Sequence, residues 1–297
     1  MKVNITPYLS DRNLDGQARS SQRQLSLALS TLKTEPERDL TINLCLIIDI
    51  SSSMAGEPLD SVKQAAIAII RKLHPGDRIS LIAFNHQATT IVQNQLVQNI
   101  GEIEQKILGL VADGGRAIDL GMKLGIKEVA RGRRNSVSQI FLLTDGENAD
   151  GSNERCLKLA QLASEYSITI NTLGFGNNWN QDILETIADS THGSLIYIEK
   201  PETVIDKFQM LLARFQSVGL TNCRISIELK PGVRLAEFKP IAQVSPETIE
   251  LPIQLEGNYF SVRLGDLMLD RPRIILINFY INQLPPGKHK IAGVQLR

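Results

Sequence analysis

Residues 43–54, with the sequence NLCLIIDISSSM, indicate the fold of this chain more clearly than any other stretch. They contain the continuous apolar run Leu44–Ile48, which is typical of a parallel strand covered on both faces. Asp49, Ser51 and Ser53 follow this run directly. Because open α/β sheets bind their ligands at the carboxyl ends of the strands, the same stretch predicts where the functional site lies.

Strand-like and helix-like segments alternate from residue 40 to about residue 218. In the first expected helix, apolar residues recur at spacings of three and four, which places them on one face. The rhythm predicts a doubly wound, mostly parallel α/β sheet with helices on both sides. The expected strands are 44–48, 79–84, 140–143, 168–175 and 194–198, and the expected helices are 61–73, 100–110, 117–130, 154–166, 182–188 and 202–216.

The two ends of the chain have a different pattern. Residues 1–39 contain two strand-like segments. Residues 219–297 contain further segments in which apolar and polar residues alternate, and Gly and Pro separate these segments. We therefore expect an antiparallel β-sandwich that the N-terminal strands join, with the α/β domain at 40–218 inserted into it. The alternation continues up to Arg297, which favours a truncated chain. The expected strands are 3–6, 25–30, 224–229, 248–254, 259–264, 274–281 and 289–296.

Bulk composition limits the classes of partner and compartment. The 297 residues include 32 basic and 32 acidic ones, so no overall charge draws the chain to nucleic acid or to an anionic membrane. No apolar run is long enough to span a bilayer, and the start lacks the layout of a secretory signal. Three scattered cysteines favour reduced thiols. These features predict a cytoplasmic protein.

Polar oxygens follow two of the expected core strands. Asp49, Ser51 and Ser53 end the first, and Asp145 follows the strand at 140–143. Carboxylate and hydroxyl oxygens at an octahedral site suit Mg²⁺, for which Mn²⁺ or Ca²⁺ can substitute. An Asp-Ser loop alone would more often be a helix cap. The second carboxylate, together with a Gly-Gly loop at 113–119, favours a site.

This ordered set of motifs resembles the von Willebrand factor A family over residues 40–218. The Asp-x-Ser-x-Ser element, the Thr-Asp-Gly element at 144–146 and the Gly-Phe-Gly strand end at 174–176 match it, and the flanking β regions are similar to those of bacterial intracellular members. The resemblance implies a metal-ion-dependent adhesion site formed by Asp49, Ser51, Ser53 and Asp145. It implies a protein-interaction module and not an enzyme, with a partner that offers Asp or Glu, and an assembly ATPase as one such partner.

Arg116 departs from this family, which has a metal-binding Thr after the two glycines. Arginine cannot ligate a cation, and at 4 Å each charge pair costs roughly 4 kcal/mol in a dielectric near 20, or twice that against a divalent ion. Mg²⁺ could still keep a water in place of the lost ligand. Arg116 could swing out and leave a weakened site that attracts an acidic partner directly. It could also fold in and bridge Asp49 and Asp145 in place of the metal. An engineered or accidental Thr→Arg change is a third explanation.

Two other functions compete with a metal-dependent interaction module. A metal-assisted phosphohydrolase would use Asp49 as its nucleophile, but position 51 is serine and no His or Lys base accompanies it. A metal-free scaffold would act through the β domain instead. Trp179 lies in a predicted loop near the strand ends, where local packing is more common than a place on the binding face.

Overall fold

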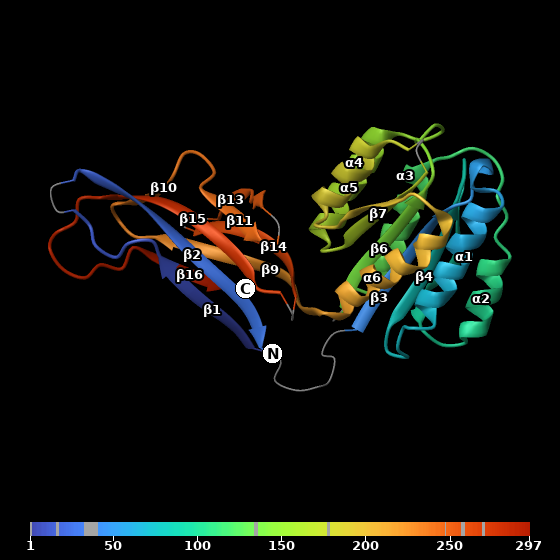
Figure 1. The fold of residues 1–297 in the computed structure, drawn as a ribbon, viewed down its shortest axis with the longest axis horizontal. Helices are drawn as coiled ribbons and strands as arrows, with labels where there is room; N and C mark the ends of the chain where they lie inside the picture. The colour runs from blue at the N-terminus through green and yellow to red at the C-terminus, as the bar shows by residue number, and fades with distance from the viewer. Residues whose placement is uncertain are drawn as a thin grey trace. The chain divides into compact units, whose positions relative to one another are not determined.

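The computed structural model describes residues 2–15, 18–32, 41–133, 136–176, 179–246, 248–256, 259–268 and 271–297. The chain divides into two compact units (Figure 1). One comprises Leu40–Gln216, and the other combines Met1–Asp39 with Ser217–Arg297. The predicted boundary between residues 39 and 40 lies outside the described residues. No helix among the described residues is long and apolar enough to cross a membrane.

The α/β unit has a six-stranded sheet in the order β5-β4-β3-β6-β7-β8. Five of these strands are parallel, so the predicted α/β sheet is confirmed. The edge strand β5 runs antiparallel to β4 and was not expected, because its polar sequence ATTIVQNQL lacks an apolar run. The strands are β3 (Thr41–Asp49), β4 (Arg78–Phe84), β5 (Ala88–Leu96), β6 (Ser136–Thr144), β7 (Thr169–Phe175) and β8 (Leu195–Ile198).

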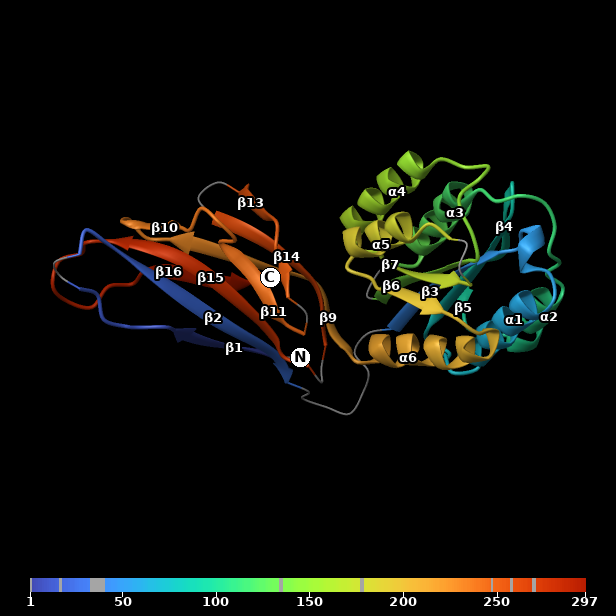
Figure 2. The ribbon, with the colours of Figure 1, turned by 45° about the horizontal axis from the view of Figure 1, so that its top comes forward.

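Helices cover both faces of this sheet (Figure 2). On one face lie α1 (Glu57–Ile70), α2 (Ile100–Leu108) and α6 (Val204–Gln216), which follows a 3-10 turn at Pro201–Thr203. On the other lie α3 (Ile118–Arg131), α4 (Asn153–Glu165) and α5 (Gln181–Ser190). Helix α1 begins four residues before the expected start at residue 61, since a proline is tolerated in the first turn of a helix.

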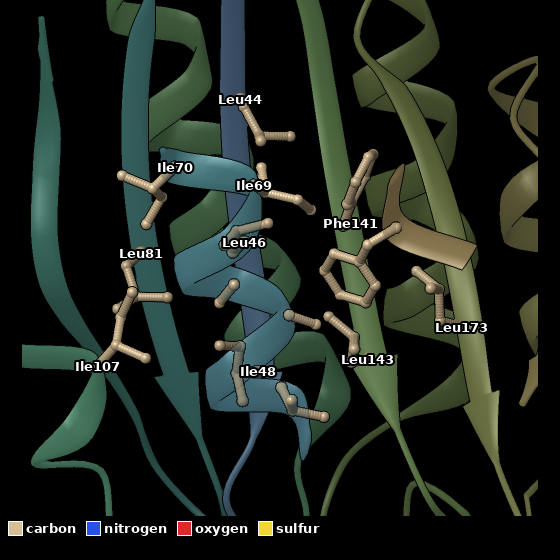
Figure 3. Packing of buried hydrophobic residues seen from close by; sticks show 14 of the residues in the cluster. Leu44, Leu46, Ile48, Ile69, Ile70, Leu81, Ile107, Phe141, Leu143 and Leu173 are labelled. Carbon is tan, nitrogen blue, oxygen red and sulfur yellow. The ribbon is translucent and has the colours of Figure 1, made fainter. Parts of the chain in front are cut away.

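Strand β3 is the centre of the hydrophobic core. Leu44, Leu46 and Ile48 pack into the cluster under α1 and α6 (Figure 3), whereas Cys45 and Ile47 pack into the cluster on the opposite face. This two-sided burial explains the uninterrupted apolar run, since neither face of the strand meets water. The strand is therefore held firmly, and its last residue, Asp49, has a fixed position at the sheet edge.

The second unit contains two antiparallel sheets. The first has the order β1-β2-β15-β11-β12, with β10 paired to β15, and the second has the order β13-β14-β9-β16. Their strands are β1 (Lys2–Leu9), β2 (Ser20–Leu32), β9 (Val218–Leu229), β10 (Val233–Leu235), β11 (Ile241–Ser245), β12 (Ile249–Glu250), β13 (Ile253–Glu256), β14 (Tyr259–Met268), β15 (Arg273–Asn282) and β16 (Ala292–Leu296).

Segments from both ends of the chain build this unit. Strand β2 pairs with β15 over ten residues, from Ser20 opposite Asn282 to Leu29 opposite Arg273. One hydrophobic cluster includes residues of both sheets. The expected single strand at 248–254 is wrong, because β12 and β13 belong to different sheets. Pro252 lies between these two strands and has no N–H for a ladder hydrogen bond, which fits the interruption.

Candidate functional site

The predicted site residues meet at the carboxyl edge of the α/β sheet. Asp49 ends β3, and Asp145 follows β6, which is its parallel neighbour. Ser51 and Ser53 lie in the loop after β3, where a short 3-10 helix spans Ser52–Met54. Met54, the last residue of this short helix, is fully buried. Adjacent parallel strands thus deliver side chains that are 96 positions apart in sequence to one edge.

Asp49 is completely buried and accepts hydrogen bonds on both carboxylate oxygens. Its Oδ1 accepts from the backbone N–H of Ser51 at 2.8 Å. Its Oδ2 accepts from the hydroxyl of Thr144 at 2.6 Å and from Nε of Arg116 at 2.6 Å. Burying a carboxylate is costly unless it is paired and hydrogen-bonded, so these three donors account for its position.

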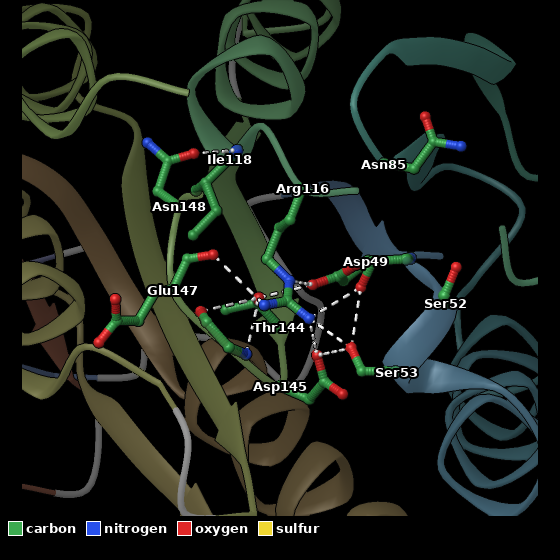
Figure 4. Close-up of polar contacts among 12 residues, drawn as sticks. Asp49, Ser52, Ser53, Asn85, Arg116, Ile118, Thr144, Asp145, Glu147 and Asn148 are labelled. Carbon is green, nitrogen blue, oxygen red and sulfur yellow. Dashed lines mark hydrogen bonds and ion pairs between the residues drawn. The ribbon is translucent and has the colours of Figure 1, made fainter. Parts of the chain in front are cut away.

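Arg116 folds into the site, which is the second of the two arrangements that the sequence left open. Figure 4 shows its guanidinium group between Asp49, Ser53 and Asp145. Its Nη2 donates to Ser51 Oγ at 2.9 Å, to Ser53 Oγ at 2.5 Å and to the carboxylate of Asp145. The same arginine therefore contacts all four predicted metal ligands.

Asp145 is the more exposed of the two carboxylates in the cluster. Ser53 donates a hydrogen bond to its Oδ1 at 2.9 Å. Burial raises the pKa of Asp145, and this effect is opposed by the Ser53 hydrogen bond and by the charge of Arg116. With both carboxylates ionised, the cluster of Asp49, Asp145 and Arg116 sums to one negative charge.

The loop that carries Arg116 is anchored by polar residues that the sequence did not single out. The N–H of Arg116 donates to Asp150 Oδ2 at 2.5 Å, and the N–H of Asp150 donates back to the Arg116 carbonyl at 2.8 Å. Asn148 Oδ1 accepts from the N–H of Ile118 at 2.7 Å, at the start of α3. The polar stretch after the Thr-Asp-Gly element was the available signal for these contacts.

Two glycines provide the space that this arrangement needs. A Cβ atom on Gly146 would lie 1.8 Å from Nη1 of Arg116. A Cβ atom on Gly115 would lie 1.8 Å from Oδ2 of Asp150. Both distances are far below van der Waals contact, so any side chain at either position would displace its neighbour.

Other polar and aromatic residues of these loops have structural roles. Asp119 lies in the first turn of α3, where it is buried and forms an ion pair with Arg155 at 2.9 Å. Glu147 is exposed, and only its backbone carbonyl accepts from Arg116 Nη1, at 3.3 Å. Trp179 packs locally, as expected, and its Nε1 donates to the Gly176 carbonyl at 2.7 Å.

The described arrangement does not fit a divalent cation. Mg²⁺ requires its oxygen ligands at about 2.0–2.1 Å in an octahedron. Nη2 of Arg116 stands among the hydroxyls and carboxylate that would supply those ligands. A cation and this guanidinium group cannot share the position. Within the described part of the chain, no group of three or more His, Cys, Asp or Glu side chains is placed to hold a metal.

Comparison with known proteins identifies relatives of both units. The profile of the von Willebrand factor type A domain matches residues 43–210. The uncharacterized protein sll0103 of Synechocystis sp. is 51% identical over 297 residues, which cover 100% of this chain and 71% of that protein. Inter-alpha-trypsin inhibitor heavy chain H3 of Homo sapiens is 30% identical over 163 residues, which cover 51% of this chain but only 18% of that protein.

Solved structures show the same fold at low identity. A von Willebrand factor type A protein from Catenulispora acidiphila superposes with a TM-score of 0.78 at 18% identity, and the match covers 98% of this chain and 68% of that chain. Proximal thread matrix protein 1 from the mussel byssus, solved with a zinc-occupied metal-ion-dependent adhesion site, has a TM-score of 0.51 at 16% identity. That match covers 59% of this chain and 48% of that chain.

Proposed function

Because this chain belongs to the von Willebrand factor type A domain family, we propose that it is a protein-interaction module that binds its partner through the loops around Arg116. One observation carries the proposal: at the carboxyl edge of the sheet, the same guanidinium group contacts Asp49, Ser51, Ser53 and Asp145. Exposed residues lie in the loops that form the site, among them Ser52 and Glu147, and Val111 in the segment before Arg116 is 73% exposed. Polar contacts at a strand-end edge with an exposed rim are suited to docking another chain.

The geometry of Asp49 supports a binding role over the phosphohydrolase alternative. A nucleophilic carboxylate needs an oxygen that faces the substrate. Asp49 is buried, and its oxygens accept from Ser51, Thr144 and Arg116. Attack by Asp49 would require these bonds to break, so the arrangement favours a carboxylate that organises loops.

The chemistry of the partner's contact group depends on Arg116. Of its five N–H donors, four have acceptors among the described residues, and one Nη1 hydrogen remains. A partner's Asp or Glu could take this hydrogen, in agreement with the acidic partner that the family resemblance implies. The single negative charge of the cluster opposes this contact, so we expect it to be weak on its own. An assembly ATPase stays one candidate for the partner.

A metal-free scaffold that acts through the β unit is the second candidate function. We propose that the two sheets of the β unit form a sandwich. The observation that favours the scaffold is a hollow of about 230 Å³ on this unit. The hollow is lined by Ser226, Glu228, Tyr259, Lys290 and Gln295, among others. A partner could bind there without any contact with Arg116.

Site-directed photo-crosslinking separates the two candidates. A photo-reactive residue is placed at Val111, which is exposed in the segment between α2 and Arg116, or at Leu255, which is 69% exposed on the β unit. The proposal predicts that a partner is captured in cells from Val111. The captured protein is then purified and titrated against the chain by calorimetry. Capture from Leu255 alone would refute the proposal and favour the scaffold.

A further inference from the structure

All three guanidinium nitrogens of Arg116 donate hydrogen bonds. Its guanidinium group donates to two carboxylates, two hydroxyls and one backbone carbonyl, which come from the end of β3, the loop after it and the loop after β6. Charge-assisted bonds of this kind are short and strong. Only 13% of the arginine side chain is exposed. The two loops are therefore joined through this one cation.

The surrounding chain is built to hold the arginine in this position. The backbone of Arg116 exchanges two hydrogen bonds with Asp150, and the adjacent Ala117 N–H donates to the Asn85 carbonyl at 2.7 Å. Gly146 leaves room for the guanidinium group, since any Cβ there would overlap Nη1. These contacts fix both ends of the side chain, so its inward position does not depend on a surface rotamer.

We propose that Arg116 is a built-in replacement for the metal ion, so that the site is closed to divalent cations and binding on this face does not require them. The guanidinium supplies the positive charge between Asp49 and Asp145 that a cation would otherwise supply. It also donates hydrogen bonds to the hydroxyls of both Ser51 and Ser53. A divalent cation and the guanidinium group would compete for the same oxygens. The guanidinium is favoured because it is part of the chain and therefore has a high effective concentration at the site.

Calorimetric titration of the full chain with Mn²⁺ and with Mg²⁺ tests this proposal without any partner. We expect no binding to the wild type at millimolar ion. We expect Arg116→Thr to bind, with an affinity at least tenfold above the wild-type limit. The matched control Asp49→Asn/Arg116→Thr removes one carboxylate and should abolish this binding. Circular dichroism establishes that each variant is folded, and Arg116→Ser replaces Arg116→Thr if that variant does not fold.

Two results would overturn the proposal. Binding of Mg²⁺ or Mn²⁺ to the wild type, lost in Asp49→Asn, would show that the arginine leaves room for a cation. A folded Arg116→Thr that binds neither ion would show that the four oxygens do not form a cation site once the arginine is removed.

The claim about binding on this face rests on the proposed function and has its own readout. Crosslinking from Val111 is repeated in the presence of a chelator, and the yield should be unchanged for the wild type. A yield that falls in chelator would refute metal-independent binding. Absence of any crosslink from Val111 would instead refute the proposed binding face, while the metal titration would still stand.

Discussion

Replacing Arg116 with glutamine should destabilise the α/β unit strongly. The variant leaves Asp49, which is fully buried, and Asp145 without their positive partner. Breaking a buried ion pair by removing one partner costs about 3–5 kcal/mol, because the remaining charge stays desolvated. Asp145 is partly exposed and can regain water, so we expect a loss near the lower bound, about 3 kcal/mol.

Urea unfolding followed by tryptophan fluorescence measures this loss in the right unit. Trp179 is the only tryptophan in the chain, and it lies in the α/β unit. Its emission therefore reports the unfolding of that unit. Arg71, whose side chain is 64% exposed, pairs with Glu104 and provides a matched control, since Arg71→Gln should lower the midpoint far less than Arg116→Gln.

A double-mutant cycle decides whether the loss comes from the pairing with Asp49. If the two groups interact directly, Arg116→Gln and Asp49→Asn should be non-additive by about 1–3 kcal/mol. Additive effects, or a loss below about 1 kcal/mol in Arg116→Gln, would refute the reasoning that Arg116 neutralises buried carboxylates.

Three further predictions concern Gly146, Thr144 and the three cysteines. Gly146→Ala should push the guanidinium group of Arg116 out of the site and destabilise the unit about as much as Arg116→Gln, roughly 3 kcal/mol by urea unfolding. Its control Gly101→Ala, in α2 with open space around it, should be neutral or stabilising by about 0.5–1 kcal/mol. Thr144→Val removes a hydroxyl that donates to Asp49, and urea unfolding should show a loss of about 1–3 kcal/mol. Burial raises the pKa of the thiol to about 12 for Cys45, about 12 for Cys156 and about 11 for Cys223. A thiol reagent at mildly alkaline pH should therefore label none of the three cysteines in the native chain and all of them after unfolding. Labelling of any of them in the native chain would contradict this prediction.

Much of the α/β unit follows from local sequence pattern. The run Leu44–Ile48 predicts a central strand because its residues are apolar on both faces, and the structure buries them on both faces. The position of Asp49 and Asp145 at one edge follows from parallel pairing, since every parallel strand ends on the same side. The polar edge strand β5 escaped prediction because an edge needs no apolar run.

Local sequence pattern does not show which distant segments pair with one another. Residues 248–254 were predicted to form one strand, yet β12 (Ile249–Glu250) and β13 (Ile253–Glu256) join different sheets. The inward orientation of the Arg116 side chain could not be predicted either. Its acceptors are 67 residues away at Asp49 and 29 residues away at Asp145. The sequence pattern predicted two carboxylates at one edge of the sheet, and the family resemblance placed Arg116 in the loop that joins them in the site. Only the folded chain decided that Arg116 points inward, because a long, flexible side chain goes where the loops of other strands place its acceptors and where Gly146 leaves it room.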